Sequence, residues 1–147
     1  MSRRRERHGR GLRGPLALPN PVTGAPLPLR QRARRVDVFT ACVRSSVHRI
    51  SEACPRALVG IDVGFEDVPS ALGSWHEGRV PLAAAVAVRP QQPGQIVLYR
   101  RPIEHRAATR RELRVLVHRT IVEQLSAITG IGPDELDPTG LGGDDWE

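Results

Sequence analysis

The chain has 147 residues, of which 22 are basic and 16 are acidic, so its net charge is +6. All of the basic residues are arginines. Residues 1–35 contain ten arginines and one acid, a net charge of +9, whereas residues 36–147 contain twelve arginines and fifteen acids, a net charge of −3. The basic character belongs to one end of the chain, which excludes a basic nucleic-acid-binding domain that spans the whole protein.

The first 35 residues contain five prolines and four glycines and show no apolar periodicity. Such a segment buries too little apolar surface to offset its ordering entropy, so we predict a disordered Arg- and Pro-rich tail over residues 1–35. The tail could bind nucleic acid or an acidic partner weakly, without base stacking because it has no aromatic residue. The alternative is a tail that only adds solubility. The candidate nucleic-acid contacts are Arg3, Arg4, Arg5, Arg7, Arg10 and Arg13.

Behind the tail, one helix and three strands are predicted. Apolar residues at spacings of three and four predict a helix over Val36–Cys54. Alternating apolar residues predict a strand over Val59–Val68. The apolar run Leu82–Val88 is typical of a buried strand, although its alanines leave a helix possible. Gln95–Arg100 is apolar on both faces, which indicates a central strand, and the following Arg101-Pro102 ends it.

The second long helix is predicted over Thr109–Thr129. Thr109 and Glu112 form a capping box at its start, and Gly130 is the usual residue just past a helix end. Pro133–Leu136 can add one further turn, and residues 138–147 are predicted to be a flexible acidic end. Together these elements predict an α+β domain over residues 36–137, with a small mixed sheet of three to four strands packed by two main helices.

The two cysteines, Cys42 and Cys54, fall on one predicted helix about 18 Å apart, too far to form a disulfide. Two free thiols are typical of a reducing compartment. No apolar run approaches the ~20 residues of a membrane helix, and no apolar segment of a secretory signal follows the first arginines. We therefore predict a cytoplasmic protein without membrane contact.

Local motifs indicate no catalytic or metal site. Neither the histidines nor the cysteines have the spacing of zinc ligands, and there is no serine elbow and no lysine for Schiff-base chemistry. Two guanidiniums where a central strand ends could bind a carboxylate or phosphate, although a solvated charge pair is the simpler interpretation. The binding candidates at this edge are Tyr99, Arg100, Arg101 and Glu66.

The segment from Ile96 to Ile131 contains the string Leu-Tyr-Arg-Arg-Pro-Ile and, at a fixed distance behind it, a helix that ends in Thr-Gly-Ile. It resembles the minimal zincin-like metallopeptidase family of bacteria, in which a Tyr-Arg-Arg-Pro-Ile type strand precedes a helix of pattern Thr-Val-Val-His-Glu-Ile-Ala-His-His-Phe-Gly-Ile. Val63–Pro69 also looks like the early strand of that family. The resemblance covers residues 36–137 and implies a zincin-like fold.

The chain departs from the family at the catalytic motif. Aligned on Thr120 and Gly130 without a gap, the resemblance places the two zinc ligands of the helix at Glu123 and Ala127, the catalytic glutamate at Gln124 and a further ligand at Asp137. Alanine has no donor atom, and a glutamine amide cannot act as a general base. Gln124 falls within the apolar stripe of the helix, so we expect it to point toward the sheet.

These departures predict a zincin-like protein that has lost zinc binding and proteolysis and acts as a binding or regulatory scaffold, with no cofactor. A protein or peptide at the former active-site cleft is a possible partner. One alternative is a residual metal-dependent hydrolase with a non-standard site of Glu66, Asp67, His76 and Glu123. The other alternative is a nucleic-acid-associated protein that binds through its arginine-rich tail.

Overall fold

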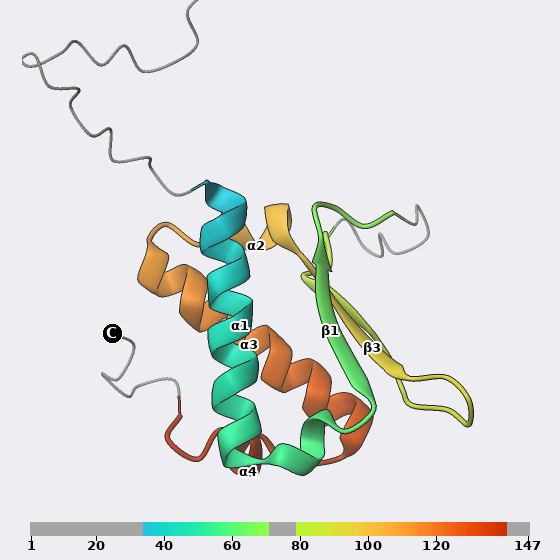
Figure 1. The fold of residues 1–147 in the computed structure, drawn as a ribbon. Helices are drawn as coiled ribbons and strands as arrows, with labels where there is room; N and C mark the ends of the chain where they lie inside the picture. Colours follow the sequence, from blue (N-terminus) through green and yellow to red (C-terminus); the bar gives the residue numbers. More distant parts are fainter. Residues whose placement is uncertain (1–33, 71–78, 141–147) are drawn as a thin grey trace, which may run out of the picture. The chain divides into compact units, whose positions relative to one another are not determined.

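The computed structural model describes residues 34–70 and 79–140 (Figure 1). The six tail arginines proposed as nucleic-acid contacts lie outside the described residues, as does His76. The predictions of a disordered N-terminal tail and a flexible acidic end concern mostly or wholly such residues and stay predictions. The described part is an α+β fold, as predicted, with one three-stranded sheet.

The first helix, α1, spans Arg35–Ala53 and confirms the predicted helix. Its apolar face, which includes Phe39 and Ile50, is buried. A short 3-10 helix, η1, follows at Pro55–Leu58. The first strand, β1, spans only Ile61–Glu66, since the chain turns at Gly60, whose φ of 69° lies in the left-handed region that glycine favours. The predicted strand was therefore too long at both ends.

The sheet is mixed, with the order β1-β3-β2. The central strand β3, Gly94–Tyr99, pairs in parallel with β1 and antiparallel with β2, Ala83–Val86. This confirms the predicted central strand. The interpretation of the apolar run at 82–88 as a buried strand was wrong in its burial, because β2 is an edge strand with Val86 43% exposed. An edge strand has a neighbour on one side only.

One face of the sheet carries the core. Phe65 of β1 contacts Phe39 of α1 edge to face, with ring centroids 5.0 Å apart, and Ile96 and Leu98 of β3 are fully buried. Helices α1 and α3 cross on the same side of β1 and β3 (Figure 1). The alternation of the strands explains this arrangement, because every second side chain points to the helices.

The end of β3 continues directly into a helix that the sequence analysis missed. Helix α2 spans Arg100–Arg106, where the Arg101-Pro102 pair was expected only to end a strand. Proline is tolerated in the first turn of a helix because the backbone N–H groups there have no intrahelical acceptor. Pro102 lies in this first turn, so it ends the strand and permits the helix.

The long helix α3 spans Arg110–Thr129 and confirms the second predicted helix. The Thr109 Oγ1 atom accepts a hydrogen bond from the Glu112 N–H at 3.1 Å, while the Glu112 carboxylate accepts one from the N–H of Ala108, one residue earlier than in a standard capping box. Gly130, with φ 75°, ends the helix. The predicted further turn is α4, Pro133–Leu136.

Two sequence predictions concern the environment of the chain. Cys42 and Cys54 are both buried and free, as expected. Within the described ranges, no helix is both long enough and apolar enough to cross a membrane. The cytoplasmic location stays a prediction.

Candidate functional site

The helix α3 carries three of the four positions at which the resemblance places the catalytic motif. Glu123 is exposed, and its Oε1 atom accepts a hydrogen bond from Arg119 Nε, one turn earlier, at 3.0 Å. Ala127 is exposed as well, and Gln124 is half-buried. The expected orientation of Gln124 toward the sheet stays a prediction. At this surface the helix offers one carboxylate, already paired, and one amide.

The fourth position, Asp137, follows α4 and is buried, with 7% of its side chain exposed. Its Oδ1 atom accepts hydrogen bonds from Arg49 Nε and Thr139 Oγ1, both at 3.2 Å. Its Oδ2 atom lies 3.1 Å from His118 Nε2. Both carboxylate oxygens are therefore engaged by groups of the protein itself.

Asp137 belongs to a set of side chains that we call the buried polar cluster: Ser46, Arg49, His118 and Asp137. The Ser46 Oγ atom lies 2.8 Å from His118 Nδ1, and both residues are completely buried. Arg49 also hydrogen-bonds to Thr139 and to the carbonyl oxygen of Gly140. The cluster joins α1, α3 and the segment behind α4, three parts of the chain that are distant in sequence.

Burial affects the protonation of His118, one member of the cluster. It lowers the pKa of His118 because an imidazolium loses its hydration inside the protein, an effect that Asp137 opposes only in part. In the neutral tautomer with its proton on Nε2, the ring faces the Asp137 carboxylate with that proton and Nδ1 accepts a hydrogen bond from the Ser46 hydroxyl. The Nε2 atom lies 3.1 Å from Asp137 Oδ2, within reach of a strong electrostatic contact.

A chain of serine, histidine and aspartate is also the arrangement of a hydrolytic triad. In such triads the serine contacts Nε2 and the aspartate contacts Nδ1. Here the two nitrogens are exchanged, since Ser46 contacts Nδ1 and Asp137 faces Nε2. Ser46 also has no exposed surface that a substrate could reach. The buried polar cluster therefore has the geometry of a structural network rather than that of a nucleophile.

We expect the buried His118 to make the protein less stable in mild acid. The unfolded chain takes up a proton on this ring near pH 6.5, but the folded chain does so only at lower pH, so the free energy of unfolding falls as the pH drops below about 6.5. The slope contributed by one such group is at most about 1.4 kcal/mol per pH unit. Urea unfolding at several pH values measures it.

The test variant is His118→Asn, and its matched control is His48→Gln. His118→Asn removes the group, so its stability should depend less on pH between neutral and mildly acidic conditions. His48 is exposed and faces Glu52 at 3.4 Å, so His48→Gln should keep the dependence of the wild-type chain. Identical pH profiles of the wild type and His118→Asn would contradict the assignment.

The binding candidates at the end of β3 differ in what they offer. Tyr99 is buried. Arg100 is almost buried and donates to the Asp67 carboxylate at 2.8 Å and to the Glu104 carboxylate at 2.9 Å. The hydrogen bond from Arg100 also lowers the pKa of Asp67. Arg100 is thus neutralised by two carboxylates and holds the end of the sheet to α2, so it is not available to a ligand.

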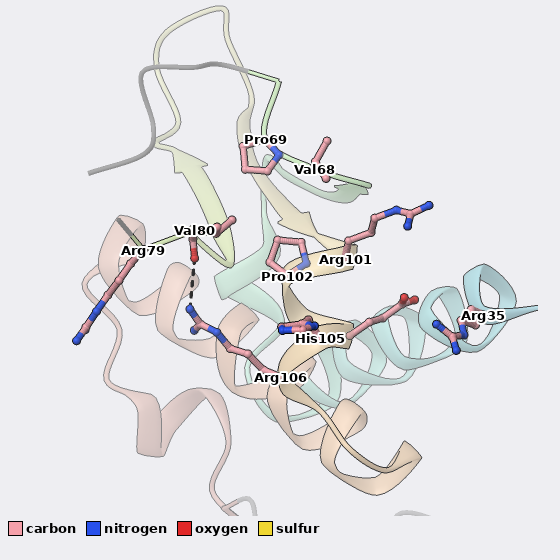
Figure 2. Close-up of a pocket in the computed structure, with 10 residues that line it drawn as sticks. Arg35, Val68, Pro69, Arg79, Val80, Arg101, Pro102, His105 and Arg106 are labelled. Atoms are coloured by element: carbon pink, nitrogen blue, oxygen red, sulfur yellow. Dashed lines mark hydrogen bonds between the residues drawn. The ribbon is translucent and has the colours of Figure 1, made fainter. Parts of the chain in front are cut away.

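Arg101 and Glu66 lie at the same edge but are exposed. Glu66 accepts a long hydrogen bond from Ser70 Oγ, at 3.5 Å. The backbone N–H of Arg101 donates to the carbonyl oxygen of Asp67 at 3.0 Å, which anchors its main chain, and its side chain lines an open hollow of about 800 Å³ beside α2 (Figure 2). Arg101 thus lies at a cavity.

The carboxylates that were considered for a non-standard metal site have other partners. Glu123 pairs with Arg119, Asp67 with Arg100, and Glu66 with Ser70. Among residues 34–70 and 79–140, no group of three or more His, Cys, Asp or Glu side chains could hold a metal ion. His76, the fourth residue of that hypothesis, lies outside these ranges.

Comparison with known proteins decides the family. A profile described as "Zincin-like metallopeptidase" matches residues 44–142, about two thirds of the chain. The chain belongs to the zincin-like metallopeptidase family. A search of curated proteins finds no match.

A zinc site of the zincin-like family needs donor atoms that these four positions do not supply together. Catalytic zinc is held by three protein ligands and leaves one position for water. Ala127 has no donor, and the carboxylates of Glu123 and Asp137 are occupied by Arg119 and by His118 with Arg49. The described residues of this zincin-like chain therefore do not fit the metal that the family name implies.

The sequence analysis missed the buried polar cluster apart from Asp137. One signal was available, since Ser46 stands four residues after Cys42 and four before Ile50, within the apolar period of α1. A small polar residue at such a position needs a buried partner. Nothing in the local pattern indicated that this partner is His118, 72 residues later.

Proposed function

We propose that this zincin-like protein has lost zinc binding and proteolysis and acts as a binding or regulatory scaffold. The observation that carries the proposal is the pairing of Asp137, the motif-equivalent carboxylate behind the helix, with His118 and Arg49 inside the buried polar cluster. A carboxylate that stabilises the core in this way is withdrawn from metal coordination.

Withdrawing Asp137 from the buried polar cluster would also cost stability. To bind a metal, Asp137 would leave Arg49 and the fully buried His118 without its carboxylate. Breaking a buried charge pair costs about 3–5 kcal/mol. The metal would have to offset this cost with only Glu123 as a further motif-equivalent donor, and a zinc ion favours three or four ligands.

The helix α3 retains the features that stabilise it in the fold. The helix α3 keeps its capping threonine and its C-terminal glycine, and its apolar face is buried against the sheet and α1. These features stabilise the fold through the protein's own groups. The exposed arginines beside the hollow at α2 offer this folded domain a candidate binding surface.

Metal content and peptidase activity test the proposal. Chain without a histidine tag is saturated with Zn²⁺, passed over a desalting column and analysed by mass spectrometry of the metal. We expect far less than one zinc per chain, no rise of the melting temperature with added zinc, and no cleavage of a mixed peptide library. Stoichiometric zinc together with peptide cleavage that a chelator abolishes would overturn the proposal.

A further inference from the structure

An open hollow of about 800 Å³ lies beside α2, between the start of α1 and the segments 68–69 and 79–80. Figure 2 shows Pro102, His105 and Arg106 of α2 near the segment that carries Val80, with Arg35 and Arg101 on one side and Arg79 on the other. Pockets for small molecules commonly measure about 300–1,000 Å³. The volume of this hollow falls within that range.

The lining of the hollow is strongly basic. Among the described residues, the lining contains four arginines and one histidine, and Glu104 is the only acid; its carboxylate already accepts a hydrogen bond from Arg100 at 2.9 Å. Within the described ranges no carboxylate forms an ion pair with any of the four arginines, which are Arg35, Arg79, Arg101 and Arg106. Arg106 donates one long hydrogen bond, to the Val80 carbonyl oxygen at 3.4 Å.

The positive charge of this region contrasts with the net negative charge of the domain. Residues 36–147 have a net charge of −3, yet the segment from 100 to 119, which contains α2 and the first half of α3, has seven arginines and two acids. Basic side chains along one cavity give it a positive potential, which attracts an anion. The guanidinium fork is also the side-chain group best shaped for the oxygens of phosphate.

The scaffold holds the centre of this hollow in place. Arg100 is bound to both Asp67 and Glu104, and the Arg101 N–H donates to the Asp67 carbonyl oxygen at 3.0 Å. These bonds join the end of β1 to the start of α2. The backbone that carries Arg101 and Pro102 is therefore positioned before any ligand arrives, which lowers the ordering cost of binding.

We propose that this hollow binds a small molecule that carries a diphosphate or triphosphate group together with an apolar or ring portion. Each phosphate group carries about one to two negative charges, so two or more are needed to balance four arginines, whereas one carboxylate is not enough. The ring portion has apolar walls to lie on, formed by Val68, Pro69, Val80 and Pro102. This site is separate from the motif-equivalent positions on α3 and does not depend on the loss of zinc.

Calorimetric titration of the full chain with inorganic pyrophosphate and with ADP tests the proposal. The basic tail is present in every variant, so its contribution is constant. The test variant is Arg101→Gln with Arg106→Gln. The control is Arg44→Gln with Arg89→Gln, two exposed arginines outside the hollow, which removes the same charge. We expect at least a tenfold loss of affinity in the test variant and less than a twofold loss in the control.

ADP should bind more tightly than pyrophosphate if the apolar walls hold the ring. Equal losses in the test and control variants would show unspecific charge attraction and overturn the proposal. The proposal would also be overturned if neither pyrophosphate nor ADP bound at concentrations up to about 1 mM. Binding of hexaglutamate in the hollow in place of the phosphates would overturn it as well. Circular dichroism melting curves establish that both variants remain folded.

Discussion

Replacing Asp137 with alanine is expected to lower the free energy of unfolding by about 3–5 kcal/mol, because the change removes the charged partner of two other buried or partly buried groups. Arg49 would lose the acceptor of its Nε–H, and His118 would lose the carboxylate 3.1 Å from Nε2. The cluster joins α1, α3 and the segment behind α4, so the loss affects packing between parts of the chain that are distant in sequence. Urea unfolding at neutral pH measures the effect.

Two further variants separate charge from shape. Asp137→Asn keeps the volume and one acceptor oxygen, so it should cost less than Asp137→Ala. Asp134 is exposed in the first turn of α4, and Asp134→Ala should change the stability by less than about 1 kcal/mol. Equal stability of Asp137→Ala and wild type would show that the core does not need this carboxylate, so Asp137 would be available to coordinate a metal.

Restoring the family motif on α3 is expected to create a zinc site without restoring proteolysis. The variant combines Glu123→His, Gln124→Glu and Ala127→His. Residues four apart on a helix face the same side, and both 123 and 127 are exposed, so the two histidines can hold one ion. We expect zinc affinity at least about tenfold above that of the wild type, equivalent to about 1.4 kcal/mol. Competition with a chromogenic chelator measures it.

Peptide cleavage should remain absent in this variant, because Asp137 stays engaged with His118 and Arg49 and cannot complete three ligands. The control keeps Ala127 and contains only the first two substitutions, so it has one histidine and should bind zinc no better than the wild type. Cleavage by the triple variant would contradict the structural role of Asp137. No gain in zinc affinity would show that positions 123 and 127 do not face a common site.

The sequence predicted helix ends well where specific capping residues mark them. Thr109, Glu112 and Gly130 delimit α3 because a capping side chain and a left-handed residue leave a recognisable pattern. The hydrophobic period of α1 and the doubly apolar β3 were equally clear. The errors lie at α2, where Pro102 favours a strand end but also permits a first helical turn, and at β2, whose alanines and valines do not reveal an exposed edge.

The candidate site was predictable only in part. The resemblance placed Glu123, Gln124, Ala127 and Asp137 at the motif, and their chemistry alone made a standard zinc site implausible. It did not indicate that Asp137 is bound by Arg49 and His118, because those contacts span 88 and 19 residues of sequence. Local periodicity describes which face of a helix is apolar, but it does not pair a polar residue with a distant partner.

The sequence by itself determined the class of the fold, the extent of the two long helices, the central strand and the family, since each depends on neighbouring residues or on a short ordered string. Only the tertiary structure decided which charges meet. It brought Ser46, Arg49, His118 and Asp137 into one buried network, and it gathered four arginines around one hollow in a domain whose composition is mildly acidic. The physical reason is that burial and electrostatic pairing depend on distances in space, which follow from the packing of α1, α2 and α3 and not from the order of residues along the chain.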